Sequence, residues 1–397
     1  MTKVKLLVNF GYYRKQWIDP FERLKDQFEL VYLFHIHPSQ ESQIYTDERI
    51  VYWSNFSGAY DLLDQEKPDR IIFMDVTSGL TIALNLAAKH SGITTFILQH
   101  GLYHNYTDYR QREIKSKQNR QKEKSTTNKP CFEFSTLSFM KNSLKSSDLF
   151  LLPKLLCYLY IQRKEGFNYA SKKVRFEARK PKYYICYSPD NALIHRELDG
   201  DIEHRCHYIG NPELFRLNKE ISQSACHKVD DDYYYLLIDQ PFADNRFGEH
   251  IKTRKEMTDF YKGLSAWCRQ NNSRLVVKLH PESFHSDWLP EREEIKWVKE
   301  TENMAMLISN SIGCFGFFST LILPVIAHKP TVLFKVGNSP LYDSISSLKA
   351  AQVLPFGAFD DIDLKRNNKR NTEGFIYRYF YQNEIDPVAL MAQILDK

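Results

Sequence analysis

Short runs of hydrophobic residues alternate with longer amphipathic segments along most of the chain. In the first half, the runs that favour β-strands are 5–10, 30–35, 70–75 and 94–98. The segments between them that have the hydrophobic spacing of helices are 17–28, 57–65 and 79–90. An alternation of this kind is typical of a parallel sheet whose strands are joined by crossover helices.

The same alternation resumes after residue 232. Further strands are expected at 233–239, 274–280, 312–317 and 331–334, and further helices at 249–270, 303–309, 319–328 and 386–396. A chain of 397 residues is also too long for one compact core. We therefore predict an α/β protein with two Rossmann-like domains, residues 1–210 and 211–397, that face each other across a cleft. The last helix is expected to close the second domain.

Residues of about 104–180 interrupt this pattern and are predicted to form an insertion in the first domain. Its first part, 110–124, contains seven Lys or Arg against two Glu, which indicates a solvated segment, a lid, or a patch for anionic lipid. Its second part, 148–161, is amphipathic and interrupted by Pro153. This part belongs either to the core or to a surface that docks on a membrane. Two strand candidates, 183–188 and 206–210, follow the insertion.

Composition and charge narrow the function classes. The net charge of +5 suits anionic substrates or an anionic membrane surface, and alone it is no signature of nucleic-acid binding, so we expect no nucleic-acid partner. The seven cysteines are scattered without a CxxC pair, which argues against a zinc site and for a reducing compartment. The apolar run near the amino terminus is too short for a secretory leader, and no apolar run reaches about 18 residues. These features predict a cytoplasmic protein.

Polar side chains follow nearly every predicted strand, at the point where the hydrophobic run ends. They are Asp75, Gln99-His100-Gly101, Ser188, Gly210-Asn211, Asp239-Gln240, His280-Pro281 and Ser319-Thr320. Ligands of open parallel sheets bind outside the carboxyl ends of the strands. We therefore expect these residues to line a ligand site.

The second half carries the elements of a phosphate site. His280 ends a strand in the stretch KLHPES, and Pro281 stops the ladder because it lacks an N–H group. Ser319 and Thr320 are expected at the start of a helix, where free backbone N–H groups favour an anion. The alternatives are a histidine that only caps its strand and an ordinary serine N-cap.

These motifs resemble a known class of enzyme. The order Asp239-Gln240-Pro241, Lys278-Leu279-His280-Pro281 and Ser319-Thr320 resembles the C-terminal half of GT-B glycosyltransferases that use CMP-activated ulosonic acids. Within that class the chain is most similar to the bacterial retaining β-Kdo transferases of capsule and lipopolysaccharide O-antigen biosynthesis. The Gln99-His100-Gly101 turn resembles the N-terminal half of capsule and glycerophosphate-polymer transferases.

The resemblance implies transfer of Kdo from CMP-Kdo to a glycan or glycolipid acceptor, with retention of configuration. Because the sequence shows no cluster of metal ligands, we expect no metal and no other cofactor. It implies that Asp239 is the nucleophile and that Gln240 orients the sugar carboxylate or the nucleophile, the alternative for Asp239 being a helix cap or a turn residue. His100 is a candidate acid or base, or it only hydrogen-bonds the acceptor sugar or has a structural role. The residues expected to bind the donor nucleotide are Lys278, His280, Pro281, Ser319, Thr320 and Asn211. Those expected to bind the acceptor are Asp75, Gln99 and Gly101.

Three alternatives stay open at this point. The His-Pro and Ser-Thr elements are shared with sialyl- and polysialyltransferases, so the donor is either CMP-Kdo or CMP-sialic acid or a related nonulosonate. Gln99-His100-Gly101 also suits a CDP-glycerol-type phosphotransferase in which His100 is the base. The third alternative is a non-catalytic nucleotide-binding module. A lipid-linked acceptor would bring the chain to the cytoplasmic face of the inner membrane.

Overall fold

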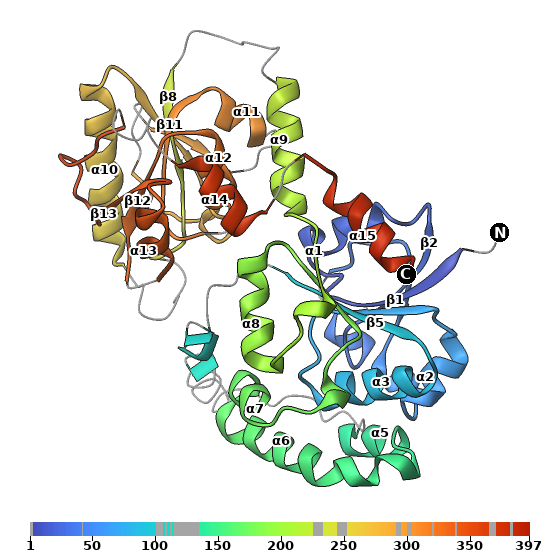
Figure 1. Ribbon diagram of the computed structural model, residues 1–397. Coiled ribbons are helices and arrows are strands. Elements are labelled where there is room, and N and C mark those ends of the chain that lie inside the picture. Colours follow the sequence, from blue (N-terminus) through green and yellow to red (C-terminus); the bar gives the residue numbers. More distant parts are fainter. Residues whose placement is uncertain are drawn as a thin grey trace. The chain divides into compact units, whose positions relative to one another are not determined.

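The computed structural model divides the chain into two compact units, Met1–Pro212 with Ile385–Lys397 and Glu213–Glu384 (Figure 1). Each unit contains one parallel sheet covered by helices. The expected α/β class with two parallel-sheet domains is therefore confirmed. The structure describes residues 3–41, 43–100, 106–107, 109–111, 113–114, 135–224, 233–243, 252–290, 295–299, 304–319, 321–337, 340–364, 371–381 and 384–397.

The first unit is built on a seven-stranded sheet of order β3-β2-β1-β4-β5-β6-β7, in which every neighbouring pair is parallel. Its strands are β1 (Val4–Asn9), β2 (Phe28–Leu33), β3 (Arg49–Val51), β4 (Arg70–Phe73), β5 (Thr94–Leu98), β6 (Tyr183–Cys186) and β7 (Cys206–Tyr208). All five residues of β5 are buried, because helices cover both faces of a parallel sheet.

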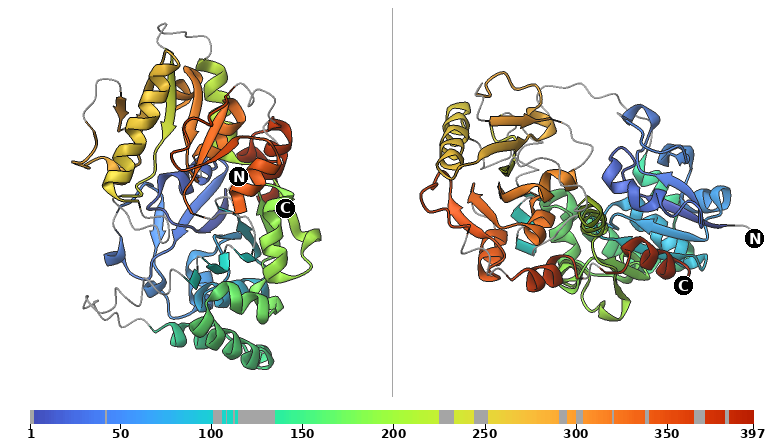
Figure 2. Two further views of the ribbon diagram at one scale, coloured as in Figure 1. Left: turned by 90° about the vertical axis from the view of Figure 1, so that its left-hand side faces the viewer. Right: turned by 90° about the horizontal axis from the view of Figure 1, so that it is seen from above.

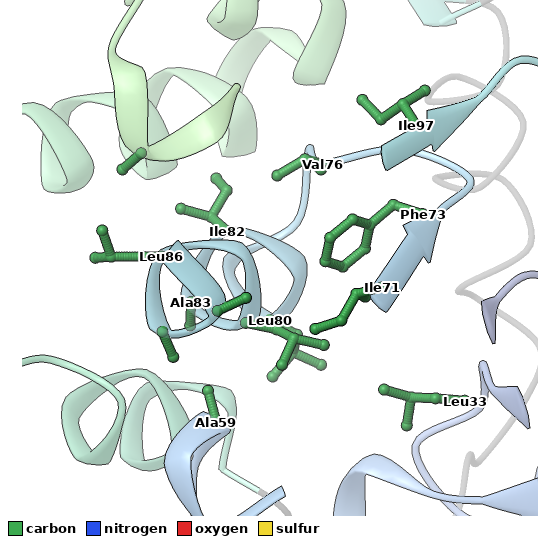
Figure 3. Packing of buried hydrophobic residues seen from close by; sticks show 14 of the residues in the cluster. Leu33, Ala59, Ile71, Phe73, Val76, Leu80, Ile82, Ala83, Leu86 and Ile97 are labelled. Carbon is green, nitrogen blue, oxygen red and sulfur yellow. The ribbon is translucent and has the colours of Figure 1, made fainter. Parts of the chain in front are cut away.

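Helices flank this sheet and bury its apolar faces. They are α1 (Lys15–Glu22), α2 (Ala59–Glu66), α3 (Gly79–His90), α5 (Thr136–Asn142), α6 (Leu152–Glu165), α7 (Phe167–Lys173), α8 (Pro189–Asp199) and α15 (Pro387–Leu395). Helix α3 begins at Ser78, whose side chain accepts a hydrogen bond from the Thr81 amide. Figure 3 shows Ile71 and Phe73 of β4 directed toward α3, with Leu80 in the space between them.

The last helix corrects one expectation. Helix α15 was predicted to close the second domain, but it belongs to the first unit. Met391 and Leu395 share a core cluster with Leu6 and Leu30 of the first sheet, and Figure 2 shows α15, in dark red, beside that unit from two further sides. The sequence pattern shows that one face of this helix is apolar, but it does not show which core buries that face.

The second unit has a six-stranded parallel sheet of order β10-β9-β8-β11-β12-β13. Its strands are β8 (Tyr234–Ile238), β9 (Arg274–Lys278), β10 (Ile295–Val298), β11 (Ser311–Gly316), β12 (Thr331–Lys335) and β13 (Gln352–Pro355). Its helices are α9 (Pro212–Ser224), α10 (Arg254–Gln270), α11 (Met304–Ser309), α12 (Ile322–His328), α13 (Pro340–Ser347) and α14 (Thr372–Tyr379). Aromatic rings fill its core, where Phe260 of α10 packs against Phe334 and Phe356 with centroids 5.0 and 4.7 Å away.

The amphipathic part of the insertion also differs from its expected form. Residues 148–161 fall into a 3₁₀ segment, η3 (Ser146–Leu151), followed by α6. Pro153 lies in the first turn of α6, where a missing N–H group costs no helical hydrogen bond, so it does not interrupt the helix. Most of the basic part, residues 115–124, lies outside the described residues. Within the described part of the chain, no helix has the length and hydrophobicity needed to cross a bilayer.

Candidate active site

Strand register places the expected donor residues at one edge of the second sheet. Ile238 of β8 pairs with both Lys278 of β9 and Gly316 of β11. Asp239, His280 and Ser319 follow these aligned residues by one, two and three positions. Because all three strands are parallel, the three side chains lie at the same carboxyl edge, which is where ligands of such sheets bind.

Asp239 is held firmly at this edge. It is 2% exposed, and its amide donates to the Lys278 carbonyl oxygen at 3.0 Å. Its Oδ1 accepts a hydrogen bond of 2.7 Å from the hydroxyl of Tyr261 on α10. The Tyr261 ring is itself fixed between Trp288, which stacks on it, and Trp297, which meets it edge-on. The carboxylate is therefore oriented by the core of its own unit.

Tyr261 is a site residue that the sequence pattern does not indicate. The residue lies on the buried stripe of α10 together with Met257, Phe260 and Leu264, so its spacing looks like that of a core position. The available signal is chemical, since a buried tyrosine hydroxyl needs a polar partner. Nothing in the spacing indicates that this partner is Asp239. Gln240, which follows Asp239, is half-buried, and its carbonyl oxygen accepts from the Phe242 amide at 2.8 Å.

His280 lies in the turn that follows β9 and can present an N–H group at this edge. It caps the 3₁₀ turn η6 (Pro281–Ser283), and its Nδ1 accepts from the Glu282 amide at 3.3 Å. Burial lowers the pKa of His280, which Glu282 opposes and Lys278 reinforces. The ring is therefore neutral at pH 7, and because Nδ1 accepts we assign the proton to Nε2. The Nε2–H group can donate to an anion.

Lys278 does not present its ammonium group as a free cation in this structure. Its Nζ donates to the carbonyl oxygens of Leu279 at 2.9 Å and Lys299 at 2.8 Å. These two carbonyl oxygens lie just beyond the carboxyl ends of β9 and β10, so the Lys278 side chain links the ends of these two strands. A direct role of Lys278 at a phosphate requires these two hydrogen bonds to be exchanged.

The start of α12 lies beside the same edge. The Ser319 hydroxyl accepts from the Ile322 amide at 3.3 Å, whereas Thr320 lies outside the described residues. Gly316 lets strand β11 and this helix approach closely, because a Cβ atom there would lie 2.8 Å from Ile322 Cδ1. The expectation of an anion at this helix start stays a prediction.

The first sheet carries a second group of polar residues at its carboxyl edge. Phe73 of β4 pairs with Ile97 of β5, so Asp75 and Gln99, each two positions further on, lie at the same edge. Asp75 is exposed, and its Oδ1 accepts from the amide of Thr77 at 3.1 Å and from the Thr77 hydroxyl. Gln99 is buried, and its amide donates to the Ile185 carbonyl oxygen at 2.9 Å.

His100 lies in an aromatic pocket at this edge, while Gly101 lies outside the described residues. Its ring meets Phe10 and Trp17 edge-on, with centroids 6.0 and 5.6 Å away. Burial lowers the pKa of His100 to about 4, an effect that Asp75 opposes and Arg14 reinforces. The imidazole is therefore neutral at pH 7 and able to accept a proton. The sequence pattern does not indicate Trp17 as a site residue, because this residue has the spacing of an apolar position on helix α1.

Two further edge residues have mainly structural contacts. Ser188 is fully buried and caps α8, with its hydroxyl accepting from the Asn191 amide at 3.2 Å. Asn211 is buried between β7 and α9. The turn before it depends on Gly210, whose φ of +82° is in the left-handed region. The described residues contain no cluster of three or more His, Cys, Asp or Glu side chains suited to a metal ion.

Comparison with known proteins identifies the family. The sequence model of the alpha-2,8-polysialyltransferase family matches residues 50–312. The chain belongs to this polysialyltransferase family. It is thus a glycosyltransferase by family, as the sequence motifs predict. The narrower resemblance to Kdo transferases is not shown, so Kdo as the donor sugar stays a prediction. Among curated proteins, no sequence matches significantly.

Solved structures with the same architecture are numerous. The wall teichoic acid polymerase TagF is 12% identical with a TM-score of 0.51, over 99% of this chain and 88% of TagF. A putative UDP-N-acetylglucosamine 2-epimerase from Listeria monocytogenes is 10% identical with a TM-score of 0.53, over 99% and 96%. The glycotransferase of kitacinnamycin is 11% identical with a TM-score of 0.51, over 99% of both chains. At these identities the likeness concerns the fold alone, and it confirms the expected GT-B-like class.

Proposed function

We propose that this polysialyltransferase-family chain transfers sialic acid, or a closely related nonulosonate, from its CMP-activated form to a glycan acceptor. The observation that carries the proposal is the family match over residues 50–312. That match includes residues that follow strands in each of the two sheets, among them His100, Asp239 and His280.

In the proposed reaction the acceptor hydroxyl oxygen bonds to the anomeric carbon. The bond from that carbon to the phosphate oxygen breaks, and CMP leaves with the electron pair. The neutral His280, through its Nε2–H group, and the backbone near Ser319 stabilise the charge that develops on the phosphate. Lys278 adds its charge once its carbonyl contacts are exchanged.

The proton of the acceptor hydroxyl needs a base. His100 is our candidate because its imidazole is neutral at pH 7, and Asp75 and Gln99 beside it would bind the acceptor sugar. Asp239 stabilises the oxocarbenium-like transition state through its negative charge, with Gln240 orienting the donor sugar. A single displacement of this kind gives a product whose anomeric configuration is opposite to that of the donor.

A second candidate is the transfer of Kdo from CMP-Kdo with retention. The position of Asp239 favours it, because a carboxylate fixed by Tyr261 at the end of a buried strand is suited to act as a nucleophile. The reaction would then pass through a covalent ketosyl-enzyme intermediate on Asp239. Water or another competing nucleophile must be excluded until the acceptor hydroxyl attacks.

A donor panel tests the proposal. The full chain is incubated with CMP-sialic acid, CMP-Kdo and CDP-glycerol and a panel of glycan acceptors, and NMR gives the anomeric configuration of each product. We expect turnover with CMP-sialic acid and an inverted product, and His280→Ala is expected to reduce kcat by at least about 10²-fold. His285→Ala, on the same loop but exposed, is the matched control.

Turnover with CMP-Kdo alone and a retained product would replace the first candidate by the second. Turnover with CDP-glycerol alone would contradict both candidates.

A further inference from the structure

Helix α6 has apolar residues on two faces, and the described residues of its own unit cover only one of them. The covered face includes Leu155 and Tyr158, which belong to the core cluster that contains α3. Tyr158 is fully buried, and its hydroxyl donates to the Thr77 carbonyl oxygen at 2.7 Å. The other face exposes 62% of Leu156 and 59% of Tyr160.

The exposed row continues beyond α6. Phe150 of η3 is 76% exposed and Leu137 of α5 is 70% exposed. In Figure 1, α5 and α6 lie on the far side of α3 from the sheet, at the outer edge of their unit. Leu156 and Tyr160 are four positions apart in α6, which places them on one side of that helix, and Leu149 and Phe150 are exposed in η3 directly before it.

This concentration of exposed apolar surface is specific to the insertion. Among the described residues, fifteen large hydrophobic side chains are exposed, and seven of them fall between positions 137 and 169. Scattered exposed hydrophobic residues are normal on a protein surface, but a contiguous group marks an interaction site. Among the described residues, none covers the outer side of this helix, where Leu156 and Tyr160 are exposed.

The charge around this row selects the partner. Residues 135–173 contain seven Lys or Arg and two Asp or Glu, a net charge of +5 that equals the net charge of the whole chain. One of the two acidic residues, Asp148, is buried and pairs with His90 Nε2 at 3.2 Å. The exposed basic side chains Lys141, Lys154 and Lys164 thus lie on the same helices as Leu137, Leu156 and Tyr160, with little compensating negative charge.

A second copy of this chain is a poor partner for such a surface. A symmetric dimer would place the same patch against itself, and two positively charged segments would repel each other. An anionic bilayer surface suits both the exposed apolar residues and the positive charge of this segment. Exposed aromatic and aliphatic side chains enter the lipid interface, while lysines contact the headgroups.

We propose that the outer face of α5, η3 and α6 docks the protein on an anionic lipid bilayer. The apolar row, Leu137, Leu149, Phe150, Leu156 and Tyr160, enters the interface, and Lys141, Lys154 and Lys164 contact the headgroups. The Lys164 ammonium group already lies 4.6 Å from the centroid of the Tyr160 ring, so an apolar and a basic contact are adjacent on this face.

Vesicle co-sedimentation of the full chain tests the proposal, using phosphatidylcholine alone and phosphatidylcholine mixed in equal parts with phosphatidylglycerol. We expect the wild type to bind the anionic vesicles and to bind neutral ones at least about tenfold more weakly. A variant with Phe150→Ser and Leu156→Ser is expected to lose at least about tenfold in binding. Lys141→Gln with Lys154→Gln and Lys164→Gln should remove most of the preference for anionic vesicles.

The matched control carries Leu193→Ser and Tyr377→Ser, two exposed hydrophobic residues outside the insertion. It should bind like the wild type. Transfer to a water-soluble acceptor and the melting temperature should be unchanged in every variant, which separates this proposal from the choice of donor. The proposal is overturned if the wild type does not bind anionic vesicles, or if the Phe150→Ser and Leu156→Ser variant binds them as the wild type does. It is also overturned if the wild type is a dimer and this variant a monomer on size-exclusion chromatography.

Discussion

The carboxyl edges of the two sheets hold their carboxylates in different ways. Asp239 in the second unit is buried, and the hydroxyl of Tyr261, 22 residues further along the chain, fixes it. Asp75 in the first unit is exposed, and its recorded hydrogen bonds come from Thr77, only two residues away. A tertiary contact therefore orients the carboxylate of Asp239, whereas a local turn orients the carboxylate of Asp75.

This difference suggests a division of tasks. A group that stabilises a developing charge must be oriented before the reaction begins, because reorganisation during the reaction would cost free energy. A group that binds a sugar hydroxyl can adjust to its ligand. The preorganised edge of the second unit thus suits the proposed donor chemistry, and the exposed edge of the first unit suits the proposed acceptor.

The sharpest test compares Asp239→Asn with Asp75→Asn. Asparagine keeps an oxygen that can accept from Tyr261 but loses the negative charge, so we expect kcat to fall by about 10²–10⁴-fold with little change in melting temperature. For Asp75→Asn we expect a rise in the KM of the acceptor of less than about tenfold. Steady-state kinetics with both substrates varied measure these changes. If the proposed division between donor chemistry and acceptor binding is wrong, the two variants will change kcat and the KM of the acceptor to the same extent.

A smaller effect is expected from Tyr261→Phe, which removes only the hydroxyl that donates to Asp239. The variant should lose about tenfold in kcat with little change in KM, since the charge remains but its orientation is less defined. The free energy of unfolding should fall by about 1–3 kcal/mol because a buried acceptor loses its donor. Tyr377→Phe is the control, since that side chain is exposed. An unchanged kcat in Tyr261→Phe would exclude this residue from positioning.

The smallest effect expected is a difference in acid stability between the units. In the first unit, burial lowers the pKa of His100 and of His195 on α8 to about 4, from 6.5 in the unfolded chain. Between pH 6.5 and 4 the unfolded chain therefore binds protons that the folded unit does not, so the free energy of unfolding falls as the pH falls through this range. Above pH 6.5 neither histidine contributes to a pH dependence.

Hydrogen exchange followed by mass spectrometry, corrected for intrinsic rates, measures this directly. Amides of the first unit should lose more protection between pH 7 and pH 5 than those of the second unit. His100→Gln should reduce that loss, whereas the exposed His204→Gln should not. Equal acid sensitivity in wild type and His100→Gln would show that His100 is not the responsible group.

Elements with strong local signals were predicted well. The helix expected at 79–90 is α3 with the same limits, because Ser78 caps it and its interior is apolar. The strand expected at 94–98 is β5. In contrast, β3, β10 and β13 were missed, since each has only three or four residues, only one of them buried, and each is the last strand at an edge of its sheet. Such strands form because a neighbouring strand offers hydrogen bonds, and a short sequence window does not contain that information.

The candidate site was predictable to a similar extent. The rule that ligands bind at the carboxyl ends of parallel strands placed Asp75, Asp239 and His280 at the edges where they lie. The rule does not give the contacts that set their chemistry. The hydrogen bond from Tyr261 to Asp239 and the packing of Trp17 against His100 both join different elements, so they depend on the packing of helices on the sheets.

The return of the chain to its first unit after Glu384 has a practical consequence. The second unit is, in topological terms, an insert within the first, so cutting at residue 212 removes α15 and uncovers the apolar side chains that it buries. A fragment that joins 1–212 to 385–397 by a short flexible linker should express and crystallise by itself, whereas 1–212 alone should aggregate. Labels at residues near either end of the chain would both report on the first unit, so a measurement on the second unit requires a label at an internal residue.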